Sequence, residues 1–316
     1  MEQENTMYGK LKDKYIDPFT DFGFKKLFGE ECNKDLLLDF LNELLYKEEG
    51  KIVSLTYLRN EKFSSSEESR KAVFDLYCEN ENGEKFIVEL QKSKQAYFKE
   101  RTLYYSTFAI TDQAVPGDEW NFKLKDVYVV GILNFLLDEN KDDPDKYRYE
   151  IMLTDIETNA VFYKKLKYVY LEMPKFKKGV EELETHFEKW MYVLKNLKRL
   201  DKIPDRLQER IFERIFAAAE IAKLTKEEYR AYIDNLNSYR DYNNVLAYAK
   251  EEGKAEGKAE GEAIGLEKGR AETKVKEEII VLNSYRAGIP IETIAAITNL
   301  TVEQVTEILK RHGVFE

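Results

Sequence analysis

Two acidic residues lie within apolar sequence of the kind that forms β-strands, and they are the most chemically informative residues of the chain. Asp75 lies between a phenylalanine and a leucine, and Glu89 lies between a valine and a leucine. A carboxylate buried without a partner costs several kcal/mol. A divalent cation would offset this cost, because Mg²⁺ is held by one or two carboxylates together with water and substrate phosphate. Such an ion can also activate water and stabilise charge on a phosphoryl group.

The two acids are predicted to lie on neighbouring strands of one β-hairpin. Residues 73–78 and 86–91 both alternate in character, and Asn82-Gly83 lies in the turn sequence between them. An Asn-Gly pair between two alternating segments is a strong hairpin signal. This pairing would bring Asp75 and Glu89 together, where their charges repel.

Strand alternation also assigns the faces of the hairpin. Asp75 is expected to share one face with Tyr77. Phe74 is expected on the opposite face, with Leu76 and Cys78. One face of an antiparallel pair is often solvated. On that interpretation the two acids are ordinary surface residues, and the pattern alone leaves both interpretations open.

The spacing of apolar residues predicts the elements that position this hairpin. The expected elements are two short helices within 22–45, a strand at 52–58, the hairpin, a helix at 96–112, a buried strand at 127–133, two strands within 147–172, and helices near 181–197, 205–222, 226–236 and 238–250. An Asn-rich turn is expected between the last two helices. Residues 20–135 therefore predict the helix, three strands, helix and strand of an α/β fold.

Residues 251–272 form a low-complexity segment in which glycine recurs at every fourth position from 253 to 269. Five glycines in a helix cost about 5 kcal/mol relative to alanine, although the glutamate, lysine and alanine between them are strong helix formers. The segment is therefore either a partly helical linker or a helix whose glycine stripe lets it associate with another helix.

The last part of the chain predicts a small helix-turn-helix-like tail. Thr301 is placed as the N-cap of its final helix. Beyond its first helix, the tail carries only Lys310 and Arg311 as cations against four glutamates. Because contacts with phosphate require cations, this composition favours packing or association over DNA reading.

Composition excludes several classes of protein. The chain has 316 residues, enough for about two domains, and 60 acidic against 50 basic residues give a net charge of −10. Net charge therefore gives no indication of a nucleic-acid partner. We find no run of 18 apolar residues and no apolar signal sequence, so we expect no membrane span. Two cysteines suit the reducing cytoplasm, and two histidines leave carboxylates as the expected carriers of any catalysis.

Several motifs follow one another in a fixed order. They are DPFTDFGFKKLFG at 17–29, VFDLYC at 73–78, FIVELQKS at 86–93, QAYFKERTLYY at 95–105 and YLEMPKF at 170–176, followed by the helical region and the Glu-Gly-Lys-Ala repeats. Together they resemble the Rpn-type recombination-promoting nucleases, often labelled PD-(D/E)XK nuclease family transposases. The resemblance spans nearly the whole chain.

The resemblance implies a restriction-endonuclease-like core and metal-dependent cleavage of DNA. Asp75 and Glu89 match the metal-binding acids, with Mg²⁺ or Mn²⁺ as the ion. Gln91 occupies the position that is lysine in the general pattern of the superfamily. A glutamine can orient water by hydrogen bonds but brings no positive charge. Asp21, from the first motif, is a candidate third carboxylate near the metal and equally a candidate helix N-cap.

Four further residues are candidates for binding DNA. Lys25 lies one helical turn after Asp21, where it can contact phosphate or pair with that acid. Arg101 and Tyr105 are four residues apart and share a helix face, from which they can contact phosphate or order the metal's surroundings. The alternative is a solvated charge and a core aromatic. Lys92 is expected to point to the opposite strand face from its neighbouring glutamine, so it is a poor replacement for the missing lysine.

The sequence thus predicts four parts and two competing functions. The parts are a nuclease-like domain at 1–175, a helical domain at 176–250, a Gly-repeat linker or association helix at 251–272 and the helical tail at 273–316. The preferred function is a Mg²⁺-dependent DNA endonuclease acting in recombination or transposition. The alternative is a weak or inactive nuclease fold that binds DNA or self-associates, which the glutamine in place of lysine supports. We expect a cytoplasmic protein with DNA as its partner, and association between copies through the C-terminal helical region.

Overall fold

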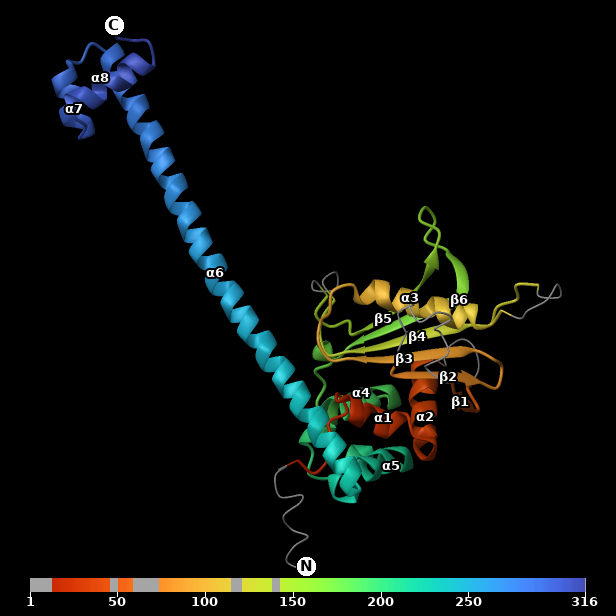
Figure 1. Cartoon of the computed structure of the whole chain (residues 1–316). Helices are drawn as coiled ribbons and strands as arrows, with labels where there is room; N and C mark the ends of the chain where they lie inside the picture. Colours follow the sequence, from red (N-terminus) through yellow and green to blue (C-terminus); the bar gives the residue numbers. More distant parts are fainter. Residues whose placement is uncertain (1–12, 46–50, 59–73, 115–120, 138–142, 316) are drawn as a thin grey trace, which may run out of the picture. The chain divides into compact units, whose positions relative to one another are not determined.

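A computed structural model describes residues 13–45, 51–58, 74–114, 121–137 and 143–315 (Figure 1). The chain divides into a first compact unit, Met1–Tyr239, and a second, Arg240–Glu316. The predicted α/β architecture is confirmed, because the first unit contains a six-stranded mixed sheet with helices on both faces, consistent with a restriction-endonuclease-like fold. No helix in the described part of the chain is both long enough and apolar enough to cross a membrane.

The sheet has the strand order β1-β2-β3-β4-β6-β5. The strands are β1 (Leu55–Tyr57), β2 (Leu76–Asn80), β3 (Lys85–Gln91), β4 (Val127–Leu133), β5 (Arg148–Thr154) and β6 (Val161–Glu172). Strands β3, β4 and β6 are parallel, and the remaining pairs are antiparallel. The three parallel strands therefore end at one edge of the sheet, where Gln91, Leu133 and Glu172 stand in register.

Eight α-helices are described. They are α1 (Asp21–Phe28), α2 (Lys34–Leu45), α3 (Phe98–Thr111), α4 (His186–Asn196), α5 (Arg210–Ala219), α6 (Lys226–Arg286), α7 (Ile291–Thr298) and α8 (Val302–Arg311). In the first unit, α3 covers one face of the sheet, and α1, α2, α4 and α5 cover the other (Figure 1). The order predicted for residues 20–135 is confirmed, since α1 and α2 are followed by β1, β2, β3, α3 and β4.

Strand alternation divides the apolar residues between two cores. Val88 and Leu90 of β3 pack in the larger core with α1, α2, α4 and α5, whereas Ile87 packs in the smaller core beneath α3. Glu89 and Gln91 have the same parity as Ile87, so they belong to the α3 face. Helix α3 is therefore the element that faces the polar side chains of β3.

The prediction of an Asn-rich turn between two helices is wrong, because α6 runs without interruption from Lys226 to Arg286. Tyr232 and Leu236 are buried in the larger core. Asn235 accepts a hydrogen bond from the backbone N–H of Phe22 at 3.3 Å. These tertiary contacts keep the asparagine-rich turn helical, because packing outweighs weak local propensity.

Residues 251–272 are part of α6 and are helical throughout, so the alternative of a partly helical linker is wrong. Apart from the adjoining backbone of α6 itself, no described atom lies within 4 Å of the place where a β-carbon would stand on any of its five glycines. The glycine stripe is thus open, and association between copies through it stays a prediction. In the same unit, α7 and α8 pack against the end of α6, and Thr301 caps α8 by accepting from the N–H of Gln304 at 3.2 Å, as predicted.

Candidate active site

The predicted hairpin is confirmed, and its open end carries the two acids. Strands β2 and β3 pair in the register Leu76 with Val88, and the turn between them includes Gly83 at a φ of +80°. One step beyond that pair, the backbone N–H of Asp75 donates to Oε1 of Glu89 at 3.2 Å. The acids are therefore neighbours, as the hairpin register predicts.

The chain bends at Asp75, so part of the predicted face assignment is wrong. Phe74 packs on the α3 face, with its ring centroid 5.4 Å from that of Tyr77 and 4.9 Å from that of Tyr105. It was expected on the opposite face, where Leu76 and Cys78 do lie. Strict alternation fails because Asp75 lies outside β2. Its Oδ2 instead accepts from the N–H of Leu90 at 2.7 Å, which extends the hairpin by a side chain.

Burial and mutual repulsion dominate the electrostatics of this pair. Glu89 is only 6 % exposed. Burial, and then the nearby charge of Asp75, raise the pKa of Glu89 to about 8. Burial also raises the pKa of Asp75, and the charge of Asp21 adds to this effect. The interpretation of both acids as ordinary surface residues is therefore wrong for Glu89.

Gln91 and Arg101 are joined directly. Nη2 of Arg101 donates to Oε1 of Gln91, and Nη1 donates to Oε1 of Gln95. The guanidinium also lies over the rings of Phe98 and Tyr105, at 5.7 Å and 5.9 Å from their centroids. Arg101 is thus held against the polar end of β3, and the interpretation of it as a freely solvated charge is wrong.

The opening motif forms a capped helix beside the acids. Thr20 is the N-cap of α1, since its Oγ1 accepts from the N–H of Gly23 at 3.0 Å, so Asp21 as N-cap is wrong. A β-carbon at Gly23 would lie 2.1 Å from the carbonyl oxygen of Asp17, so this close turn requires glycine. Asp21 pairs with Lys25 at 2.8 Å, which confirms one of the two predicted roles of that lysine.

Comparison with known proteins decides the family. The sequence model of the PD-(D/E)XK nuclease family transposases matches residues 18–249, which include α1, the hairpin and α3. The chain belongs to this family. Searches of curated proteins and of solved structures gave no match. Membership in the PD-(D/E)XK nuclease family transposases supports a nuclease-like function, a hydrolase acting on DNA.

PD-(D/E)XK nucleases generally use divalent metal ions, and the acid pair of this member fits such an ion. Each carboxylate uses one oxygen to accept from a backbone N–H, and no described residue donates to the other oxygen of Asp75 or Glu89. One buried and one half-buried carboxylate, each with a raised pKa and an available oxygen, suit a cation such as Mg²⁺, which also keeps water ligands. Over the described ranges, no three or more His, Cys, Asp or Glu side chains form a metal-binding group. Asp21 as a third ligand therefore stays a prediction.

Three cations act electrostatically on the acid pair. The charges of Arg101 and Lys25 oppose the rise in the pKa of Glu89, and those of Lys25 and Lys92 oppose the rise in the pKa of Asp75. Lys92 is half-buried, and its Nζ lies 5.3 Å from the ring centroid of Tyr239 in α6. Burial lowers the pKa of Lys92. The positive charge absent at position 91 is thus supplied nearby by other residues.

Tyr105 packs as a core aromatic and also lies near the acid pair. Its half-buried ring packs edge-on against Phe74 at 4.9 Å, as a core aromatic does. Burial and the charge of Glu89 raise its pKa, so its hydroxyl lies within electrostatic range of the acid pair. Contact of Tyr105 with DNA stays a prediction.

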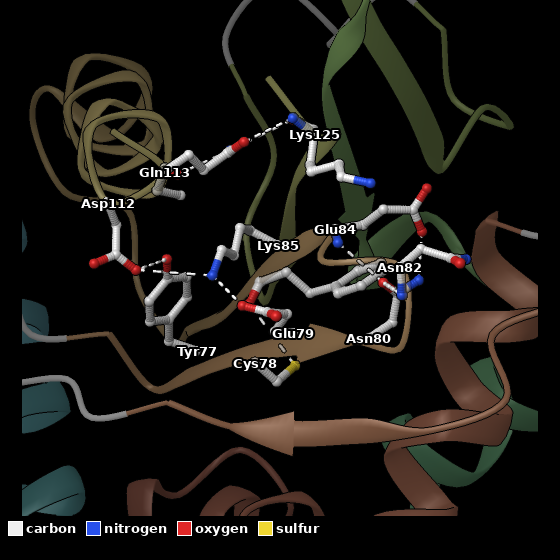
Figure 2. A network of polar contacts seen from close by, with 12 residues as sticks. Tyr77, Cys78, Glu79, Asn80, Asn82, Glu84, Lys85, Asp112, Gln113 and Lys125 are labelled. Atoms are coloured by element: carbon white, nitrogen blue, oxygen red, sulfur yellow. Dashed lines mark hydrogen bonds and ion pairs between the residues drawn. The ribbon is translucent and has the colours of Figure 1, made fainter. Parts of the chain in front are cut away.

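A second polar network fixes the far end of α3 and was missed by sequence reasoning (Figure 2). The buried ammonium of Lys85 pairs with Glu79 and lies 3.8 Å from Asp112, the C-cap of α3. Tyr77 also donates to Asp112 at 3.3 Å. Tyr77 and Lys85 looked like ordinary strand positions because their shared partner, Asp112, lies about 30 residues further along the chain. With Arg101 bound at the other end, α3 is tied to the hairpin at both ends.

Asp17 is the other residue whose importance the sequence did not reveal. It is 7 % exposed, and its Oδ1 accepts from the N–H of Phe19 at 2.9 Å. Its Oδ2 accepts from Nζ of Lys198 at 3.0 Å, and its own N–H donates to the hydroxyl of Tyr232 at 2.9 Å. No local signal could reveal partners about 200 residues away. Asp17 therefore anchors the α1 motif to the helical region.

Replacing Gly131 with alanine is expected to destabilise the nuclease core by about 1–3 kcal/mol. A β-carbon there would lie 2.9 Å from Cδ1 of Tyr170 and 3.3 Å from Cζ of Phe98, the first residue of α3. Urea unfolding measures the free energy of unfolding. Gly257→Ala is the control, because its surroundings are open and helix propensity predicts a small stabilisation there. Equal stability of Gly131→Ala and the wild type would contradict this packing role.

Proposed function

We propose that the protein is a divalent-metal-dependent DNA endonuclease that serves recombination or transposition. The observation that carries this proposal is the pairing of half-buried Asp75 with buried Glu89, both with raised pKa values and both with an oxygen available to a cation. A purely structural role would leave two repelling acids in a costly position. Family membership supports DNA as the substrate and recombination or transposition as the process.

In the proposed reaction, Asp75 and Glu89 would hold the Mg²⁺ or Mn²⁺ ion. When bound, this ion supplies water activation and stabilisation of the phosphoryl charge. Gln91 orients the attacking water, and Arg101 polarises the Gln91 amide through its hydrogen bond to Oε1. Hydrolysis adds water across one P–O bond, leaving one phosphate end and one hydroxyl end.

The DNA backbone is proposed to lie against a rim of cations around the acid pair. Lys25 acts electrostatically on both acids, Lys92 on Asp75 and Arg101 on Glu89. Asp21 stays a predicted third metal ligand that would have to leave its ion pair with Lys25. With a net charge of −10, binding should be local and should weaken as salt rises.

The second candidate function is DNA binding without efficient cleavage. One observation favours it beyond the missing lysine. The Oε1 atom of Gln91 accepts from Arg101, and its Nε2 donates to the carbonyl of Ser93 at 3.1 Å. Only one N–H of this amide is left to orient water, so a slow or inactive site is the competing expectation.

Nicking of supercoiled plasmid tests the proposal. Wild-type protein is expected to nick the plasmid in Mg²⁺ and not in EDTA, and Asp75→Asn is expected to lose this activity. Glu157→Gln, an exposed acid in the β5–β6 turn, is the matched control and should retain it. Equal nicking by wild type and Asp75→Asn would overturn the endonuclease assignment. Metal-dependent stabilisation without nicking by the wild type would favour the second candidate.

A further inference from the structure

A hollow of about 250 Å³ lies between α3 and strands β5 and β6. Its lining residues are Lys99, Leu103, Leu137, Tyr149, Ile151, Tyr168 and Tyr170. The buried residues Leu137, Tyr168 and Tyr170 form its floor, whereas Lys99, Leu103 and Ile151 are exposed at its rim. Its volume is below the roughly 300–1,000 Å³ of pockets for drug-sized molecules, so it suits a single planar ring system.

Hydrogen bonds to α3 hold the two tyrosines of the floor in place. The hydroxyl of Tyr170 shares a hydrogen bond of 2.7 Å with Thr102, and that of Tyr168 shares one of 2.8 Å with Ser106. Both partners on α3 are buried. The apolar parts of the rings are thereby turned toward the hollow with their polar ends satisfied, so the hollow is preformed.

A buried ion pair fixes the opposite wall. Glu172 and Lys175 are 2.9 Å apart and almost fully buried. Lys175 donates to the hydroxyl of Tyr149 at 2.8 Å, and Glu172 accepts from the N–H of Leu137 at 2.7 Å. The nuclease mechanism proposed above uses neither charge, yet both position residues that line the hollow.

The hollow is close to the acid pair. Glu89, Gly131 and Tyr170 stand opposite one another on three neighbouring strands, and all belong to the face that α3 covers. Two strand spacings separate Glu89 from Tyr170, which is about 10 Å between their backbones. The first turn of α3, which begins at Phe98, lies over Gly131 between them. A DNA strand with its phosphate at the acids can therefore bring a nearby nucleotide to the hollow.

Charge around the hollow favours a nucleotide over a neutral ring. Lys99 lines the rim. The exposed Lys146 lies 5.0 Å from the ring centroid of Tyr149, another lining residue. A planar base suits the apolar, tyrosine-lined interior, and its phosphate suits the lysine at the rim.

We propose that this hollow is a subsite for one unpaired nucleobase of the DNA strand that is cut. This inference rests on the proposed nuclease function and adds its substrate class, which is DNA with a single-stranded or flipped-out nucleotide near the cut. A base enters this subsite only after leaving its stack, and mismatched or unpaired bases leave most readily. Aromatic contacts with one base change affinity by roughly ten- to a hundredfold.

Binding of a short single-stranded oligonucleotide tests the subsite without relying on cleavage. The probe is an abasic sugar-phosphate chain carrying a single 2-aminopurine, compared with the same chain lacking any base, both in EDTA. Asp75→Asn protein serves as the background, so a failure of nuclease activity leaves the readout intact. We expect the base to improve affinity about tenfold or more, and its fluorescence to change on binding.

Leu103→Trp is the variant that fills the hollow. Because the Leu103 side chain is 55 % exposed, the change should not disturb folding, which circular dichroism verifies. We expect it to abolish the advantage of the base and to leave binding of the abasic chain unchanged. Tyr104→Trp, at the neighbouring exposed position that does not line the hollow, should keep the advantage. Equal base dependence in Leu103→Trp and wild type would overturn the proposal, as would equal affinity for both chains in the wild type.

Discussion

Replacing Glu89 with glutamine is expected to stabilise the metal-free protein and to abolish its stabilisation by Mg²⁺. Glutamine keeps the acceptor for the N–H of Asp75, which Glu89 binds at 3.2 Å. It removes the repulsion from Asp75 and the cost of burying a charge, the two causes that raise the pKa of Glu89 to about 8. At pH 8.5 we expect a gain on the order of 1–3 kcal/mol in the free energy of unfolding.

The sign of the pH dependence follows from the same shift. Because the pKa of Glu89 is higher in the folded protein than in the unfolded chain, the folded state binds more protons between about pH 4.5 and pH 8. Stability of the metal-free wild type should therefore fall as pH rises through this range. The Glu89→Gln variant should lack that part of the slope.

Thermal unfolding with and without Mg²⁺ at several pH values measures both effects. For a unit of this size, each kcal/mol corresponds to about 2–4 °C in Tm. Wild type should gain stability from Mg²⁺, most strongly above pH 8, where Glu89 has lost its proton. Glu157→Gln is the control and should behave as the wild type. A lower Tm for metal-free Glu89→Gln than for wild type would contradict the claim that the buried charge of Glu89 destabilises the folded protein.

Moving the positive charge from position 101 to position 91 is expected to recover nicking activity. Either single substitution, Arg101→Gln or Gln91→Lys, is expected to lose it. Arg101 donates to Oε1 of Gln91, so Arg101→Gln removes the charge that this amide relies on. Loss of such a group costs about 10²- to 10³-fold in kcat. Gln91→Lys alone places an ammonium beside the guanidinium, and the two cations repel. The double variant Gln91→Lys/Arg101→Gln restores one cation at the end of β3.

A double-mutant cycle of initial nicking rates measures this coupling. We expect the double variant to exceed Arg101→Gln at least tenfold, because residues in direct contact are not additive. Gln95→Ala is the control, since it removes the other acceptor of Arg101 and should change the rate only slightly. If the double variant is no faster than Arg101→Gln, a cation at position 91 cannot replace the one at position 101. The Mn²⁺ affinity of each variant separates loss of the metal from loss of the cation.

Local sequence patterns predicted the elements whose signals are local. The hairpin followed from Asn82-Gly83 between alternating segments, and the acid pair followed from its register. The cap at Thr301 followed from one hydroxyl before an apolar helix. Each of these rests on residues within a few positions of one another, which is the range over which propensity and capping act.

Features built from distant residues escaped the sequence. The bend at Asp75 depends on the packing of Phe74 against Tyr105 of α3. Strand alternation alone cannot predict this contact. The continuity of α6 depends on Tyr232 and Leu236 being buried against the rest of the first unit. The bond from Arg101 to Gln91 joins residues whose spacing suggested separate roles. In each case tertiary packing decided between conformations that the local sequence left nearly equal.

The two acids differ in what the fold itself asks of them. Asp75 accepts a hydrogen bond from the N–H of Leu90 and so closes the open end of the hairpin, next to the first residue of β2. Glu89, in contrast, destabilises the folded state when charged, because its carboxylate is buried. A lineage of this family that no longer cut DNA would gain stability by losing Glu89 and would lose stability by losing Asp75. The glutamate is therefore the better indicator of an active member, and an aspartate retained alone would report only an intact hairpin.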